Sequence, residues 1–146
     1  MEDLWPDFEF ESSMTPKEIL LTQADFLSKK TSGVLIGEVH TCEPNDYLLY
    51  HALKCPSVSN PDLNKPIGHV LYIRAPFFND YRFEILSITH YLLNMYPLQL
   101  NNVLNNCYYT IDSEEYLMKK LSEIFASKDV LSILNSLLIQ SKYSAD

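Results

Sequence analysis

The chain has 146 residues, of which 47% are hydrophobic and 21% charged; these proportions are typical of a folded globular domain and exclude wholesale disorder. The formal net charge of −8 argues against binding to nucleic acid, which depends on Lys and Arg, and makes a basic protein partner easier to accommodate. Only three glycines are present and neither GxGxxG nor GxxxxGK[ST] occurs, so we expect no phosphate-binding loop and no cofactor.

The first 14 residues, called the N-terminal arm below, are acidic and rich in aromatic side chains. They hold five of the 19 acidic residues, no basic residue and the single tryptophan, and Pro6 argues against a helix. One interpretation is an extended segment or edge strand packed over the domain, and another is disorder. The functional interpretation is a partner-binding segment in which aromatic side chains anchor and acids steer. Its candidate binding residues are Trp5, Asp7, Phe8, Glu9 and Phe10.

Residues 15–146 are expected to form a single domain that begins with a helix. Thr15 suits the N-cap, Pro16 suits the first helical position, and Glu18 follows the cap by three residues, which together make a capping box. Apolar residues then recur at helical spacing and predict a face that packs against a sheet.

Residues 33–41 alternate in polarity and predict the first strand, with residues 47–54 as its hairpin partner and a long, proline-containing loop at 56–66. Four side chains of the types that bind zinc lie in the first strand and its partner. Any strand places residues two apart on one side, so this spacing is weak evidence and we predict no metal site. The weak candidate ligands are Glu38, His40, Cys42 and His51.

The longest period-two pattern covers residues 67–91 and predicts a β-hairpin with one apolar face. We expect Ile73 to lie opposite Tyr81 on the apolar face. Val70 and Leu86 are expected on the other face, which suggests that something covers that face in part.

This second face is otherwise polar, and the expected register puts Arg74 beside Asp80 and Tyr72 beside Arg82. Two arginines can grip a carboxylate or a phosphate. We prefer the alternative that they pair with acids across the strands. Tyr72, Arg74, Arg82 and Glu84 are therefore weaker candidates for a binding site.

Two adjacent phenylalanines occupy the predicted hairpin turn. Phe77 and Phe78 cannot both turn inward easily, so either a neighbouring element or a partner must cover them. Both are therefore candidate partner-binding residues.

Two short strands and two helices complete the predicted fold. Residues 97–100 predict an edge strand and residues 107–111 one further strand. Asp112 is expected to cap the first helix and Ser127 the second, and the short link between them predicts an antiparallel αα-hairpin. The expected fold class is α+β, with an antiparallel sheet of four to six strands, an N-terminal helix and a C-terminal αα-hairpin packed against it.

We expect a cytoplasmic protein that contacts no membrane. The N-terminus shows no basic segment followed by an apolar run, and no stretch approaches 18 uninterrupted apolar residues. Cys42, Cys55 and Cys107 are odd in number and widely spaced, which fits reduced thiols.

No catalytic residue is predicted, because no GxSxG elbow or comparable signature occurs. We expect a non-enzymatic domain that binds a protein, and an inhibitor of the immunity or antitoxin type fits this size and charge. The alternative is a small-ligand-binding domain or minor enzyme whose pocket, between sheet and helices, is lined by His40, His51 or His90. His69 is expected to be a core histidine. A third hypothesis is self-association through an exposed strand edge.

Overall fold

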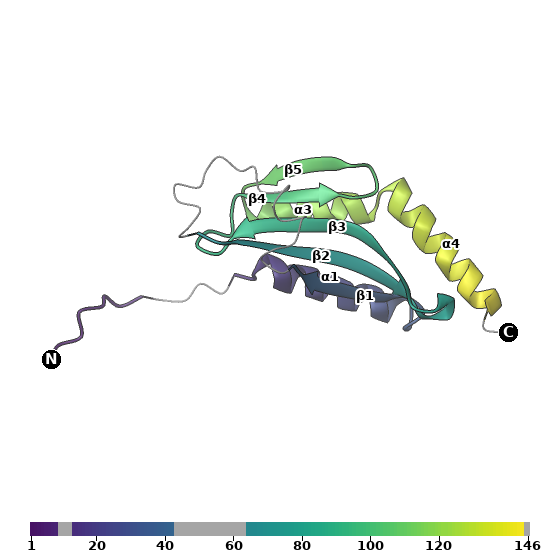
Figure 1. Ribbon diagram of the computed structural model, residues 1–146, viewed down its shortest axis with the longest axis horizontal. Coiled ribbons are helices and arrows are strands. Elements are labelled where there is room, and N and C mark those ends of the chain that lie inside the picture. The colour runs from purple at the N-terminus through teal and green to yellow at the C-terminus, as the bar shows by residue number, and fades with distance from the viewer. Residues whose placement is uncertain (9–12, 43–63, 145–146) are drawn as a thin grey trace.

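The fold is α+β, as predicted, with an N-terminal helix, a five-stranded antiparallel sheet and two C-terminal helices (Figure 1). The structure, a computed structural model, describes residues 1–8, 13–42 and 64–144. In chain order the elements are α1 (Pro16–Lys30), β1 (Ile36–Thr41), β2 (Pro66–Ala75), the 3₁₀ turn η1 (Pro76–Phe78), β3 (Tyr81–Tyr91), β4 (Leu98–Asn102), β5 (Cys107–Ile111), α3 (Glu114–Phe125) and α4 (Lys128–Ser144).

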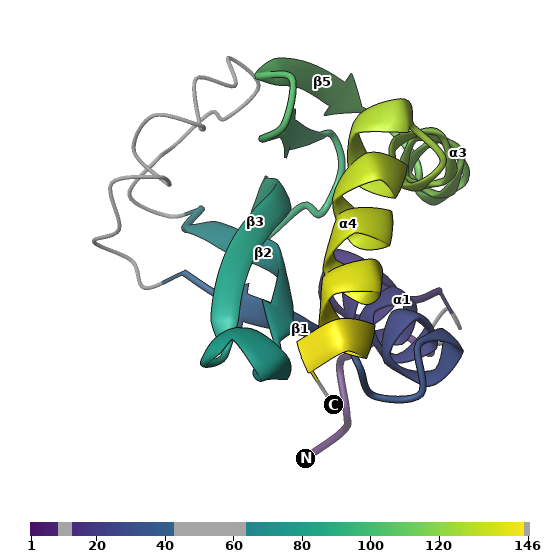
Figure 2. The same cartoon turned by 90° about the vertical axis from the view of Figure 1, so that its right-hand side faces the viewer.

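The strands form one sheet in the order β1-β2-β3-β4-β5. Figure 2 shows α1, α3 and α4 on one side of the sheet, and the hydrophobic core lies between these helices and the strands. The predicted strand at 47–54 and most of the predicted loop at 56–66 fall outside the described residues; among those described, β1 pairs only with β2. In the described part of the chain, no helix is long and apolar enough to cross a bilayer.

Helix α1 begins as the sequence predicts and lies very close to the sheet. The Thr15 hydroxyl accepts a hydrogen bond from the Glu18 amide at 3.1 Å, and Pro16 occupies the first helical position. A Cβ added to Gly37 of β1 would lie 2.5 Å from the Ala24 carbonyl oxygen of α1. The missing side chain at Gly37 therefore permits the close approach of helix and strand.

The register of the β2–β3 hairpin differs from the predicted one by two residues near the turn. Ile73 pairs with Phe83 and not with Tyr81. The connection has the expected length of five residues but lies one residue later in the chain, at 76–80 instead of 75–79, because Asn79 and Asp80 follow η1 in left-handed conformations, with φ of 55° and 57°, and β3 begins only at Tyr81. A slip of two residues leaves the predicted face of each side chain unchanged.

A β-bulge in the same hairpin corrects a second expectation. Between Tyr72 and Leu71 the register shifts by one further residue: Tyr72 pairs with Glu84, whereas Leu71 pairs with Leu86. One extra residue, Ile85, is thereby accommodated in β3. Leu86, which was expected on the polar face, is consequently buried in the core beside Leu71.

Strand β4 lies inside the sheet and not at its edge. The predicted strand at 97–100 is present, but β4 pairs with both β3 and β5. Leu98 and Leu100 are fully buried, and β5 occupies the predicted residues. Pro97, which suggested an edge strand, stands just before β4 and so removes no donor from the ladder.

The two predicted C-terminal helices are present, with one change of cap. The Ser113 hydroxyl, and not Asp112, accepts a hydrogen bond from the Tyr116 amide at 3.1 Å. Ser127 caps α4 as predicted, accepting from the Val130 amide at 3.4 Å. Figures 1 and 2 show α4 running obliquely from the end of α3 towards η1, which it contacts, instead of doubling back along α3. Helix α4 therefore covers the end of the sheet next to η1.

Candidate functional site

Aromatic side chains are exposed at the turn of the β2–β3 hairpin, residues 75–82, called the hairpin tip below. Phe78 packs against the core, on the side where α4 meets η1, whereas Phe77 is 48% exposed. Tyr81, which was expected on the apolar face, is 57% exposed and stacks on Phe83 with ring centroids 6.4 Å apart. Phe78 therefore has a structural role, whereas Phe77 faces solvent.

Ion pairs connect the hairpin tip to β1. The Arg74 guanidinium donates through Nε to Glu38 Oε1 and through Nη1 to Asp80 Oδ1, both at 2.6 Å. Arg82 Nε lies 3.1 Å from the second oxygen of Glu38. The hydrogen bonds to Glu38, followed by those to Asp80, raise the pKa of Arg74 above its ordinary value. One carboxylate therefore links both arginines and holds the turn in place.

These contacts support the structural interpretation of the polar face. Both arginines already contact carboxylates, so an external anion would have to displace Glu38 or Asp80. The Tyr72 hydroxyl donates to Glu84 at 3.3 Å, and burial, with a further contribution from Glu84, raises the pKa of Tyr72.

The weak metal candidates do not form a site in the described part of the chain. Glu38 and His40 line a polar hollow of about 460 Å³ on the sheet face away from the helices, together with Tyr72 and Arg82. Within residues 1–8, 13–42 and 64–144, no group of three or more His, Cys, Asp or Glu side chains lies close enough to hold a metal ion. His51 falls outside those residues.

The N-terminal arm lies far from the hairpin tip. Figure 1 shows residues 1–8 projecting beyond one end of the sheet, whereas η1 is at the opposite end. Trp5 is 78% and Phe8 67% exposed, and Asp7 is exposed as well. Glu9 and Phe10 fall outside the described residues. The structure thus separates the candidate partner-binding residues into two groups.

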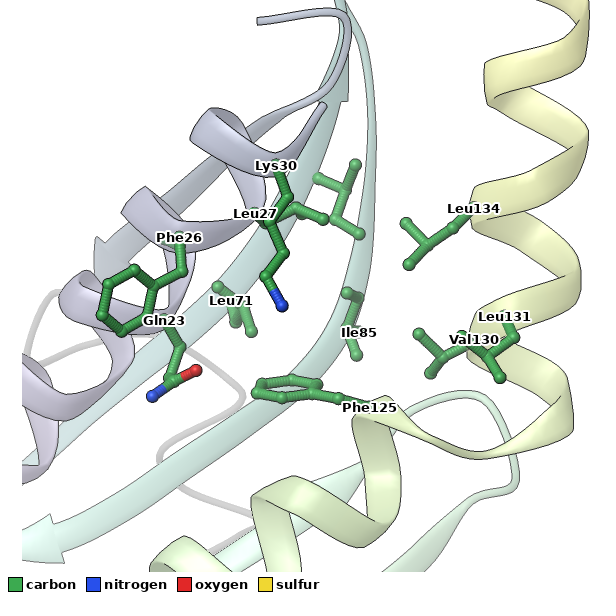
Figure 3. Close-up of a pocket in the computed structure, with 12 residues that line it drawn as sticks. Gln23, Phe26, Leu27, Lys30, Leu71, Ile85, Phe125, Val130, Leu131 and Leu134 are labelled. Atoms are coloured by element: carbon green, nitrogen blue, oxygen red, sulfur yellow. The ribbon is translucent and has the colours of Figure 1, made fainter. Parts of the chain in front are cut away.

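A mainly apolar cavity of about 310 Å³ lies between the sheet, α1 and α4, where the sequence suggested a pocket (Figure 3). No histidine is among the described residues that line it. His40 faces the polar hollow, and His90 is buried with its ring 5.5 Å from that of His69. The lining of this cavity comes from apolar faces of the helices and sheet, and none of the described histidines contributes to it.

His69 is a core histidine, as predicted, and has one hydroxyl neighbour. Its Nδ1 lies 3.1 Å from Thr41 Oγ1. A catalytic histidine lies at a similar distance from the hydroxyl that it activates. Burial, followed by the positive charges of His90 and Lys17, lowers the pKa of His69 to about 4. A base this weak and this buried is poorly suited to activate a hydroxyl at neutral pH.

Of the exposed residues at the hairpin tip, sequence reasoning named Phe77 and Arg82 but missed Tyr81. The signal that could have identified Tyr81 is the Asn79-Asp80 pair, because two residues that tolerate left-handed backbone extend the turn to residue 80 and place Tyr81 next to its tip. Comparison of the chain with protein-family models, with curated proteins and with solved structures found no match, so the geometry of these surfaces is the basis for a functional assignment.

Proposed function

We propose that the protein binds another protein and that the hairpin tip is its principal contact. The observation that carries this proposal is the joint exposure of Phe77, Tyr81 and Arg82 on one braced turn. Tyr and Arg are enriched among the residues that dominate interface energies. Because Glu38 and α4 already hold the turn, a partner would have little conformational entropy to remove from it.

The N-terminal arm is a second, separate contact in this proposal. Trp5 supplies an exposed aromatic anchor, and Asp3 and Asp7 lie beside it as exposed acids. An extended arm loses more conformational entropy on binding than a braced turn does, and we therefore place the principal contact at the tip. In the arrangement of Figure 1, a partner that contacts both would extend along the sheet.

The charge of the chain favours a basic partner. The net charge of −8 would accelerate encounter with a positively charged surface, and this acceleration should weaken as salt is added. A small acidic inhibitor of the immunity or antitoxin type is the form of protein binding that these features support best.

The test begins with capture of partners from host extract on the full chain, followed by titration of the purified partner. Tyr81→Ala should weaken its affinity at least about 30-fold, the loss typical of an interface hot spot. Tyr108→Ala is the matched control, because Tyr108 is exposed to a similar extent, 60%, on β5. Tyr108→Ala should bind like the unaltered chain.

The N-terminal arm is tested by removing residues 1–14. A smaller loss of affinity than that caused by Tyr81→Ala would support the arm as the secondary contact. If Tyr81→Ala binds normally and the truncated chain does not bind, the tip is not the contact and the arm is.

A further inference from the structure

The cavity between the sheet and the helices has an apolar floor and apolar walls. Leu71 and Ile85 form part of its floor, Leu27 and Leu134 face each other from α1 and α4, and the Phe125 ring closes one end (Figure 3). Its volume of about 310 Å³ is at the lower end of the range for small-molecule sites. That volume holds about ten water-sized groups at roughly 30 Å³ each, which suits one alkyl chain of about ten carbons.

Of the residues that the structure describes, Lys30 is the one charged residue that lines this cavity. Figure 3 shows the Lys30 ammonium group pointing from the last turn of α1 into the space between α1 and α4. Among the described residues of the lining, Gln23 is the only other polar side chain. Within the described ranges no carboxylate forms an ion pair with Lys30, whereas its neighbour Lys29 binds Asp25 at 2.8 Å and does not line the cavity.

We propose that this cavity binds a single-chain carboxylate, with the alkyl chain between α1 and α4 and the carboxylate at Lys30. The apolar lining favours the chain, because burial of each CH₂ group contributes roughly 0.8 kcal/mol, about fourfold in affinity. The single cation at the opening selects a negative headgroup. This ligand site is independent of the proposed protein contact, since no residue of the hairpin tip lines the cavity.

The probe is decanoate, titrated calorimetrically into the full chain below its micellar concentration, with octanoate, decanol and decyltrimethylammonium as comparisons. Decanoate should bind at one site, about tenfold or more tighter than octanoate because it buries two further CH₂ groups. Decanol should bind more weakly than decanoate, and the cationic amphiphile should bind most weakly. Equal affinity for decanoate and decanol would overturn the proposal, as would the absence of saturable binding.

Two adjacent lysines provide the matched variants. Lys30→Gln should weaken decanoate binding about threefold to fivefold and leave decanol binding unchanged, because the lost ion pair is partly exposed. Lys29→Gln should leave both affinities unchanged. Leu134→Phe should reduce binding of both ligands by filling the cavity. Both lysine variants alter only exposed side chains, so they test the carboxylate contact even if Leu134→Phe misfolds. Equal decanoate affinity for the two lysine variants would refute this contact.

Discussion

At the scale of single residues, His69 should make stability depend on pH. Its pKa falls from 6.5 to about 4 on folding, because burial removes the ring from water and, to a lesser extent, because His90 and Lys17 oppose its positive charge. Between these values the unfolded chain binds the extra proton and the folded chain does not. His69 therefore contributes its full stabilisation above pH 6.5, and the contribution is lost as the pH falls towards 4, by about 3 kcal/mol at most.

Urea unfolding at several values between pH 7 and pH 4 measures this contribution. The unfolding free energy of His69→Asn should fall less over this range than that of the unaltered chain. His40→Asn is the control, because it makes the same substitution at an exposed histidine on the polar face. Parallel curves for the unaltered chain and His69→Asn would show that folding does not lower the pKa of His69.

Gly37 should tolerate no side chain, for a reason of space. A Cβ there would lie 2.5 Å from the Ala24 carbonyl oxygen and 2.6 Å from its Cα, and neither backbone atom can move without shifting α1. We expect Gly37→Ala to lower the unfolding free energy by about 2 to 3 kcal/mol, as overpacking of a core does.

Gly33→Ala is the comparison for this substitution. At Gly33 nothing lies within 4 Å of an added Cβ, but φ is +80°, so a cost of about 1 kcal/mol from backbone strain is expected. Ala24→Gly should not rescue Gly37→Ala, because the closest contacts are to backbone atoms. Equal costs at the two glycines in denaturant titrations would contradict the steric explanation.

At the scale of elements, the cap of α3 gives a test that separates two adjacent residues. The Ser113 hydroxyl accepts the hydrogen bond from Tyr116, whereas Asp112 stands one residue outside the cap. Ser113→Ala should therefore cost about 1 kcal/mol of stability. Asp112→Ala should cost less than half of this, since only its charge near the helix end is lost. If Asp112→Ala lowered the stability more than Ser113→Ala in thermal or urea unfolding, Asp112 would be the cap, as the sequence suggested.

The elements themselves were largely predictable, because their signals are local. The capping box at Thr15 and the alternation of residues 107–111 each specify an element by its own residues. The register of β2 with β3 was not predictable in this way. It depends on the backbone of Asn79 and Asp80 and on a bulge at Ile85, and neither alters the period-two pattern near the turn.

At the scale of the whole molecule, the candidate sites depend on how distant elements meet. The sequence indicated that Phe77 and Phe78 need cover, but only the oblique course of α4 decides that Phe78 is covered and Phe77 is exposed. The same course gives the cavity a lining of apolar residues with Gln23 and Lys30, and none of the described histidines belongs to it. Helix direction is set by the packing of side chains from several elements, and it has no local signature.

The exposure of Trp5 has a spectroscopic consequence. Because the only indole of the protein stands in solvent on the N-terminal arm, excitation at long wavelength reports the arm and nothing of the core. Its emission should stay close to that of free tryptophan while urea unfolds the domain. A blue shift on addition of a partner would then reveal engagement of the arm directly, without labels and without a background signal from the rest of the chain.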